Sequence, residues 1–87
     1  MRLDLEIGRY LVVTREAQAE ELAAAAGCSG ISVKRAIGEL RHMGAVIRSE
    51  WRGRSCWYVW ENADACRQRL LQWVGLEEQR TLLERAD

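Results

Sequence analysis

The chain has 87 residues and a net charge of zero, with 48% hydrophobic residues, four tryptophans and no proline. A chain of this length forms about one hydrophobic core, so we expect one compact domain. The apolar fraction excludes an intrinsically disordered protein. No apolar run approaches the roughly 18 residues that cross a bilayer, and the opening MRLDLE lacks the apolar stretch of a secretory signal. The sequence therefore predicts a cytoplasmic protein without a membrane segment.

The cysteines are too few and too scattered for a metal site. Cys28, Cys56 and Cys66 form no Cys-x-x-Cys pair, and the single histidine, His42, is far from each of them in sequence. A structural zinc site needs about four ligands at characteristic spacings, and a cytosolic setting disfavours a disulfide. We expect no metal and no other cofactor, with Cys28 in the core and His42 on the surface.

The charges are unevenly distributed along the chain. The segment 27–60 holds six lysines and arginines but only two glutamates, a local net charge of +4, and the remainder carries −4. A neutral protein with a basic middle is polarised, so one of its faces can attract phosphate.

Three helices are predicted in the first half of the chain. Apolar residues recur every three to four positions over 3–13, which is the period of an amphipathic helix. Strong helix formers fill 17–26, and Gly27 follows as a left-handed C-cap. Ser29 is a suitable N-cap for a third helix over 30–43.

A β-hairpin is predicted after the third helix. The runs 45–51 and 55–60 are rich in β-branched and aromatic residues, and they flank the sequence Arg52-Gly53-Arg54. Two such runs around a glycine-centred turn are typical of a hairpin. Its tip is therefore expected to be cationic.

A last helix is predicted at the C-terminus, with Asn62 or Asp64 as its N-cap and with a break at Gly75 left open. The order of elements is then helix-helix-helix-strand-strand-helix. The predicted fold class is mainly α with a small β-hairpin, in which a three-helix core carries the hairpin and a C-terminal helix. We expect a domain over 1–61 and a helical extension over 62–87, together forming one compact unit.

The second strand of the hairpin is apolar on both faces. Alternation places Cys56, Tyr58 and Trp60 on one face and Trp57 and Val59 on the other. Whichever face meets the core, large apolar groups remain on the opposite one. We expect the C-terminal helix to cover them by packing on the hairpin, either within the monomer or in a homodimer.

Several of these motifs, in this order, resemble a winged helix-turn-helix. They are AEELA (19–23), GCS (27–29), VKRAIGELR (33–41), MGAVI (43–47) and RGR (52–54). The set is similar to the DNA-binding domains of DeoR-type regulators and of biotin repressors. The resemblance implies that the third helix lies in the major groove and that the second crosses above it. It also implies that the hairpin, or wing, reaches phosphate or the adjacent minor groove.

The resemblance places the DNA contacts on the third helix and the wing. The predicted contact residues are Ser29, Gly30, Ile31, Ser32, Lys34, Arg35, Arg41, Arg48, Arg52 and Arg54. Arg35 is the candidate for reading a base, and Lys34 and Arg41 are candidates for phosphate. Gly30 and Ile31 depart from the usual pattern, and Ile31 can contact a thymine methyl group.

The function expected from this resemblance is sequence-specific binding of double-stranded DNA by a small transcriptional regulator, with a homodimer suited to two half-sites. The small size also suits a regulator encoded by a phage or mobile element. The alternative is a winged-helix protein-interaction module that binds an acidic partner, which the neutral net charge favours. We expect no enzymatic activity, because the sequence has no useful Cys/His pair, glycine-rich phosphate loop or paired acidic motif.

Overall fold

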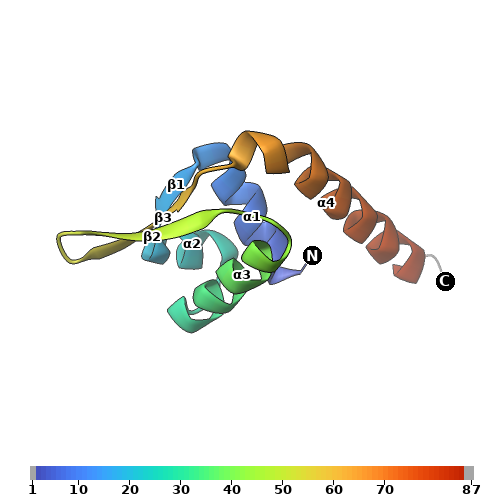
Figure 1. Ribbon diagram of the computed structural model, residues 1–87. Helices are drawn as coiled ribbons and strands as arrows, with labels where there is room; N and C mark the ends of the chain where they lie inside the picture. Colours follow the sequence, from blue (N-terminus) through green and yellow to red (C-terminus); the bar gives the residue numbers. More distant parts are fainter. Residues whose placement is uncertain (1, 86–87) are drawn as a thin grey trace.

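The protein is mainly helical, with a small antiparallel sheet. The computed structural model describes residues 2–85, and their side chains as far as Gly75 (Figure 1). The elements in chain order are α1 (Leu3–Thr14), β1 (Glu16–Gln18), α2 (Ala19–Ala26), α3 (Gly30–His42), β2 (Ile47–Arg52), β3 (Ser55–Trp60) and α4 (Ala63–Arg85). The predicted fold class, helices with a small β-hairpin, is confirmed.

The ends of the helices follow the local signals in the sequence. Gly27 ends α2 in the left-handed conformation with φ of 65°, which costs glycine little because it has no Cβ. The Ser29 hydroxyl accepts a hydrogen bond from the Ser32 N–H at 3.2 Å and so caps α3. Both predicted caps are therefore confirmed. Of the two predicted N-caps of the last helix, Asn62 directly precedes α4, but its side chain bonds Val46, Trp60 and Gly44 and not the helix. Asp64 lies within the first turn.

The strand β1 was not predicted, and the predicted helix over 17–26 begins only at Ala19. The backbone of Glu16, Ala17 and Gln18 pairs with β3, in the sheet order β1-β3-β2. This pairing satisfies backbone groups along one edge of β3, which local helix propensity cannot do. Ala17 lies opposite Tyr58 and is fully buried.

The sheet has two chemically different faces. The inner face turns Ala17, Ile47, Tyr58 and Trp60 into the hydrophobic core beneath the sheet. The outer face, by alternation, carries Glu16, Arg48, Glu50, Arg52, Trp57 and Val59. The hairpin β2–β3 extends past β1, because β1 pairs only with the stretch 57–59.

The helix α1 lies between α3 and α4, and Gly8 makes this close approach feasible. A Cβ atom at Gly8 would lie 2.9 Å from Cδ2 of Leu40 on α3 and 3.2 Å from Cδ1 of Leu70 on α4. Leu70 and Val74 of α4 are buried in the core. The first half of α4 is thus part of the packed body.

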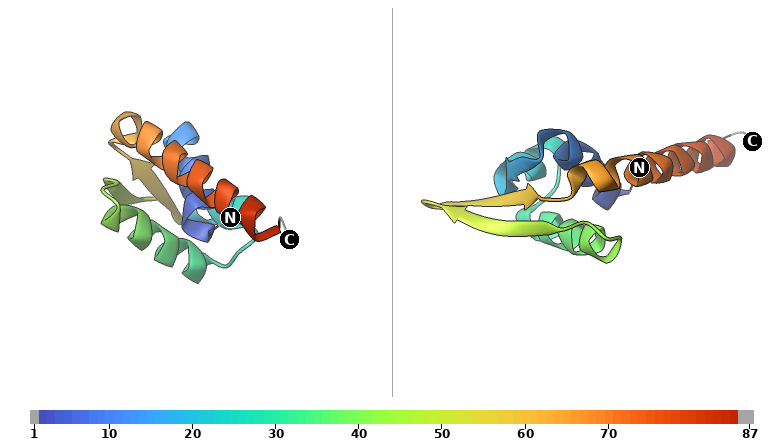
Figure 2. Two further views of the ribbon diagram at one scale, coloured as in Figure 1. Left: turned by 90° about the vertical axis from the view of Figure 1, so that its right-hand side faces the viewer. Right: turned by 45° about the horizontal axis from the view of Figure 1, so that its top comes forward.

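Within the described part of the chain, α4 packs mainly on α1, and its contacts with the hairpin are few. Of the predicted packing on the wing, the described residues show a contact with the inner face, where Leu70 and Trp73 line a small cavity with Trp60. Leu70 and Val74 are buried in the core. The helix continues without a break at Gly75. Figure 2 shows the hairpin and the end of α4 pointing away from the body in opposite directions. No described helix is both long and apolar enough to cross a membrane.

Candidate nucleic-acid interface

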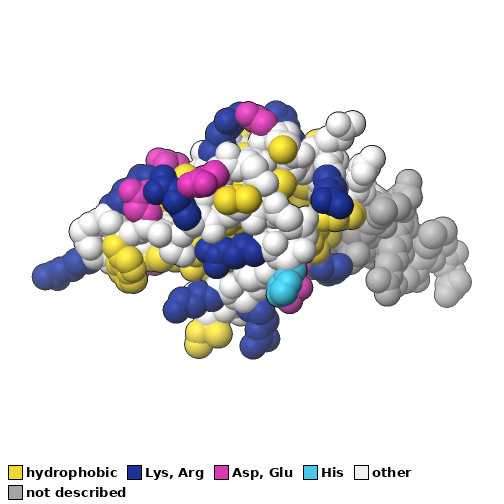
Figure 3. Space-filling view, viewed as in Figure 1, with side chains coloured by type: hydrophobic (Ala, Val, Ile, Leu, Met, Phe, Trp, Pro, Cys, Tyr) yellow, Lys and Arg dark blue, Asp and Glu magenta, His cyan; other side chains and the backbone are white. Residues whose placement is uncertain are grey.

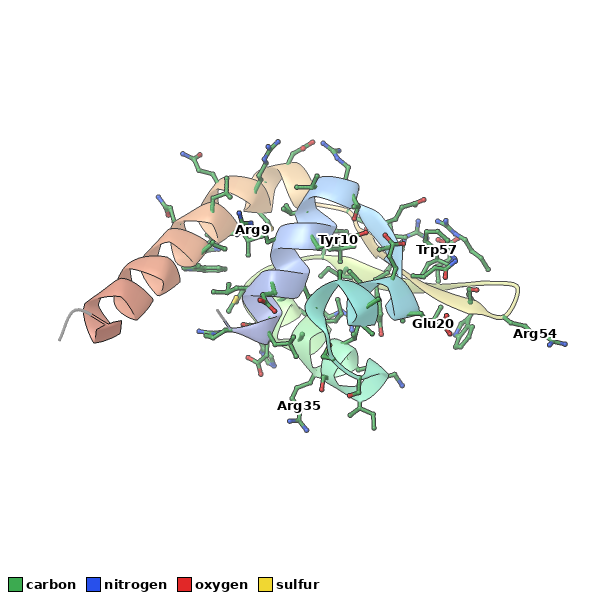
Figure 4. All side chains as sticks on the ribbon, turned by 180° about the vertical axis from the view of Figure 1, so that it is seen from behind. Arg9, Tyr10, Glu20, Arg35, Arg54 and Trp57 are labelled. Atoms are coloured by element: carbon green, nitrogen blue, oxygen red, sulfur yellow. The ribbon has the colours of Figure 1, made fainter. Side chains whose placement is uncertain are left out.

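The exposed side of α3 carries an apolar residue and two cations. Ile31 is 76% exposed, and Lys34 and Arg35 are exposed as well. Figure 4 shows Arg35 pointing away from the body of the domain. Neither the Lys34 nor the Arg35 side chain makes a hydrogen bond or an ion pair with any described residue. Both cations are available to an external anion.

The first turn of α3 is open to an approaching molecule. A Cβ at Gly30 would have nothing within 4 Å. The hydroxyls of Ser29 and Ser32 lie 3.1 Å apart, and the Ser29 hydroxyl also accepts the capping bond. Gly30 therefore leaves the start of the helix unobstructed, while the two serines are partly occupied with each other.

Arg41 connects α3 to the hairpin. Its Nε donates to the Ile47 carbonyl oxygen at 2.8 Å, and its Nη2 lies 3.4 Å from the Ser49 hydroxyl. These bonds fix β2 relative to α3. Arg41 was predicted as a DNA contact, and the structure gives its guanidinium an internal role.

Arg48 and Arg52 lie on the outer face among acidic residues. Arg48 Nε is 2.8 Å from Glu61 Oε1, and its Nη1 is 3.7 Å from Glu50. Arg52 bonds both carboxylate oxygens of Glu16, at 3.2 and 3.0 Å, and reaches Glu50 at 3.2 Å. The hydrogen bond from Arg52 holds the pKa of Glu16 below its ordinary value. Both arginines are engaged within the protein.

Arg54 occupies the tip of the hairpin. Arg52 and Ser55 form the last strand pair, so the turn consists of Gly53 and Arg54. Gly53 has φ of 65°, a conformation that favours glycine. Arg54 is exposed at the tip (Figure 4) and has no ion pair or hydrogen bond among the residues that the structure describes.

The ten predicted contact residues thus fall into two groups. Those that present free polar or apolar groups to solvent are Gly30, Ile31, Lys34, Arg35 and Arg54. Those engaged in internal hydrogen bonds or ion pairs are Ser29, Ser32, Arg41, Arg48 and Arg52. Figure 3 shows basic side chains around α3 and at the hairpin tip, with most acidic ones near β1 and the start of α4.

One exposed residue in this region was not among the predicted contacts. Trp51 on β2 is 71% exposed, although it lies on the inner face of the sheet opposite Cys56. The inner face is covered only where α1, α2 and α3 lie beneath it, and Trp51 is beyond that region, near the hairpin tip. Alternation along β2 places Trp51 on the inner face and so predicts burial, which means that no local signal indicates its exposure.

A hollow of about 340 Å³ borders α3 on the side of α1. Ser32, Arg35 and Glu39 line it from α3, and Asp4 lines it from α1. Asp4 is buried, and its carboxylate is paired with Arg2 at 2.6 Å. Arg35 therefore borders an open hollow whose wall also carries the carboxylates of Asp4 and Glu39.

Among the described residues, no cluster of histidines, cysteines and carboxylates could hold a metal ion. The three cysteines are free and half-buried, and Cys28 packs against the core as predicted. No protein-family model matches the chain, and a search of curated proteins found no match to it. The functional assignment therefore depends on the geometry of α3 and the hairpin.

Proposed function

We propose that the protein binds double-stranded DNA in a sequence-specific manner, as a small transcriptional regulator of the winged helix-turn-helix type. In this arrangement α3 enters the major groove, α2 crosses above it and the hairpin contacts the flanking backbone. The helix pair α2–α3, followed directly by a hairpin, supports this assignment.

One observation carries the proposal. Of the six cations in the basic segment, three are bound internally, whereas Lys34, Arg35 and Arg54 remain without an anionic partner among the described residues. These three come from the exposed side of α3 and from the hairpin tip. Phosphate is the anion whose regular spacing suits separated cations on two projecting elements.

The dimensions of α3 suit a major groove. Its 13 residues span about 20 Å, and the groove of B-DNA, about 12 Å wide, admits a helix. Arg35 can donate two hydrogen bonds to a guanine edge, and Ile31 can contact a thymine methyl group. Lys34, a compact point charge, is suited to phosphate.

The internal arginines support the interface indirectly. The bonds from Arg41 to Ile47 and Ser49 fix the angle between α3 and β2. The ion pairs of Arg52 hold the hairpin against β1. Two DNA-contacting elements that are held rigidly relative to each other lose less entropy on binding than mobile ones do.

The test is a titration of a fluorescein-labelled duplex of mixed sequence, followed by anisotropy at several salt concentrations. We expect log K to fall linearly with log salt, by about 0.9 for each phosphate contact. Arg54→Ala should weaken binding and make this slope shallower by about one contact. Arg67→Ala is the matched control, because Arg67 is an exposed cation on α4, away from α3 and the hairpin.

An acidic protein partner is the second candidate, and the exposure of Ile31 and Trp51 favours it. The same titration separates the two functions. Wild-type protein that fails to bind duplex DNA even at low salt would exclude the DNA proposal. The three free cations would then be assigned to a protein surface.

A further inference from the structure

Trp51 is the one exposed tryptophan of the four. Trp60 is buried, and Trp57 and Trp73 are half-buried, whereas Trp51 is 71% exposed. The strand register places Trp51 on the inner face, opposite Cys56, and Trp57 on the outer face, opposite Glu50. Trp51 therefore lies on the same side of the hairpin as the helices.

The surroundings of Trp51 are a cleft between the hairpin and the start of α2. This cleft, about 180 Å³, is lined by Trp51, Arg54 and Ser55 from the hairpin and by Gln18 and Glu20 from the opposite wall. Figure 4 shows Glu20 on the helix side of the hairpin and Trp57 on the other side. Arg54 supplies a cation on the hairpin side of this cleft, and Glu20 supplies a carboxylate on the opposite wall, which repels phosphate from that wall. The Trp51 ring is the large apolar part of the lining and suits an uncharged group.

We infer that Trp51 is an apolar DNA contact, which packs on the deoxyribose edge of the groove next to the one that α3 occupies. The inference rests on the proposed function and adds a residue to it. Arg54, two positions along the hairpin, contacts phosphate at the same time. The two residues have different roles: the Arg54 guanidinium binds the charged phosphate, and the Trp51 indole covers the uncharged sugar.

The chemistry favours DNA as the occupant of this surface. Arg54, which is unpaired among the described residues, lines the same cleft as the indole, and the unpaired Lys34 and Arg35 lie on α3. Together these cations suit a polyanion. Deoxyribose presents apolar C–H groups between phosphates, and apolar side chains are used at groove edges and between base steps. A large exposed aromatic beside such cations is the composition expected of a recognition surface.

The test compares Trp51→Ala with Val13→Ala in the full chain, by the anisotropy titration. Val13 is 70% exposed on α1 and so matches Trp51 in exposure. Trp51→Ala should weaken binding about tenfold, the change expected when roughly 55 Å² of apolar surface is no longer buried. Its salt slope should stay that of the wild type, because no counterion is involved. Val13→Ala should bind as the wild type does.

A second measurement uses the conservative variant Trp51→Phe. Duplex DNA should reduce acrylamide quenching of the wild-type tryptophan emission and should leave the quenching of Trp51→Phe unchanged. Wild-type protein that binds no DNA overturns the proposed function. Wild-type protein that binds DNA, with a Trp51→Ala variant of equal affinity or with no DNA-dependent protection from acrylamide, overturns the role of Trp51 alone.

Discussion

The guanidinium carbon of Arg52 lies 4.5 Å from the centroid of the Trp57 ring, on the outer face of the hairpin. The same guanidinium bonds Glu16 on β1, so it covers an aromatic ring and connects two strands. Trp57, on the outer face of β3, is thus partly covered by a cation. The hairpin consequently has a structural arginine and a free one, Arg52 and Arg54, separated by a single glycine.

This division predicts different behaviour for the two arginines. Arg52→Ala should lower the melting temperature, because it removes the bonds to Glu16 and exposes Trp57. Arg54→Ala should leave the melting temperature nearly unchanged and weaken DNA binding. Circular dichroism melts and anisotropy titrations of both variants check this. Equal melting temperatures for the two variants would contradict the structural role of Arg52.

The ion pair of Glu16 makes stability depend on pH in a defined direction. The hydrogen bond from Arg52 lowers the pKa of Glu16 in the folded protein. The ion pair therefore contributes its full stabilisation to the folded state above the ordinary glutamate pKa. It is lost as the pH falls through the lowered value. Urea midpoints measured across the acid range should therefore fall less steeply in Glu16→Gln than in the wild type.

Glu39→Gln is the control for this pH dependence. The Glu39 side chain is exposed and makes no hydrogen bond or ion pair within the described part of the chain. The urea midpoint of the Glu39→Gln variant should fall with decreasing pH as steeply as that of the wild type. If the urea midpoint of Glu16→Gln falls as steeply toward low pH as that of the wild type, the ion pair with Arg52 adds nothing to stability.

The sequence was informative where local signals decide the structure. The period of α1, the Ser29 cap and the glycine at the hairpin turn each predicted an element that the structure contains. It was uninformative where distant segments meet. The three residues of β1 have weak strand propensity and form a strand only because β3 supplies partners.

The candidate site shows the same limit. Arg52 and Glu16 are 36 positions apart, and only the β1–β3–β2 pairing brings them together. The sequence could therefore identify a basic segment but not which of its cations are neutralised. The exposure of Trp51 could not be predicted either, because it depends on where β1 ends beside β3 and on where α2 begins beneath the hairpin.

Asn62 is a further residue whose role depends on the fold. Its Oδ1 accepts from the Val46 N–H and from Trp60 Nε1, each at 2.8 Å, and its Nδ2 donates to the Gly44 carbonyl oxygen at 3.0 Å. Asn62→Ala should lower the free energy of unfolding by about 1–3 kcal/mol, because the buried indole loses its acceptor. Asn62→Asp keeps the acceptor and should lower the free energy of unfolding, measured with urea, by less than Asn62→Ala does. A larger loss in Asn62→Asp than in Asn62→Ala would contradict this role of the Asn62 oxygen.

Arg35 and Lys34 should differ in what they recognise. Arg35→Ala should weaken binding to the preferred duplex by about 1–3 kcal/mol and reduce the preference over other sequences, if the guanidinium binds a base edge. Lys34→Ala should weaken binding to all sequences to a similar degree, as loss of a phosphate contact does. Competition titrations against a set of duplexes measure both. A uniform loss in Arg35→Ala would assign Arg35 to phosphate.

The last prediction concerns α4 and the homodimer expected from the sequence. Leu70 and Val74 are buried against the body, whereas the end of α4 extends away from α1 and the hairpin (Figure 2). A chain ending at Gly75 keeps both packing residues and should remain folded. A chain ending at Asn62 loses them and should unfold or aggregate, since removing one buried leucine side chain alone costs about 2–5 kcal/mol.

Sedimentation velocity then tests whether the end of α4 joins two copies. Leu76, Leu82 and Leu83 are apolar residues beyond Gly75, and their removal should convert a full-length dimer into a folded monomer. Because a dimer that occupies two half-sites binds more tightly than a single protomer, the chain ending at Gly75 should also have a lower affinity for a two-site duplex than the full chain. Its affinity for a one-site duplex should be unchanged. A full-length protein that sediments as a monomer with and without a two-site duplex would rule out the dimer and leave DNA binding by one α3 and one hairpin.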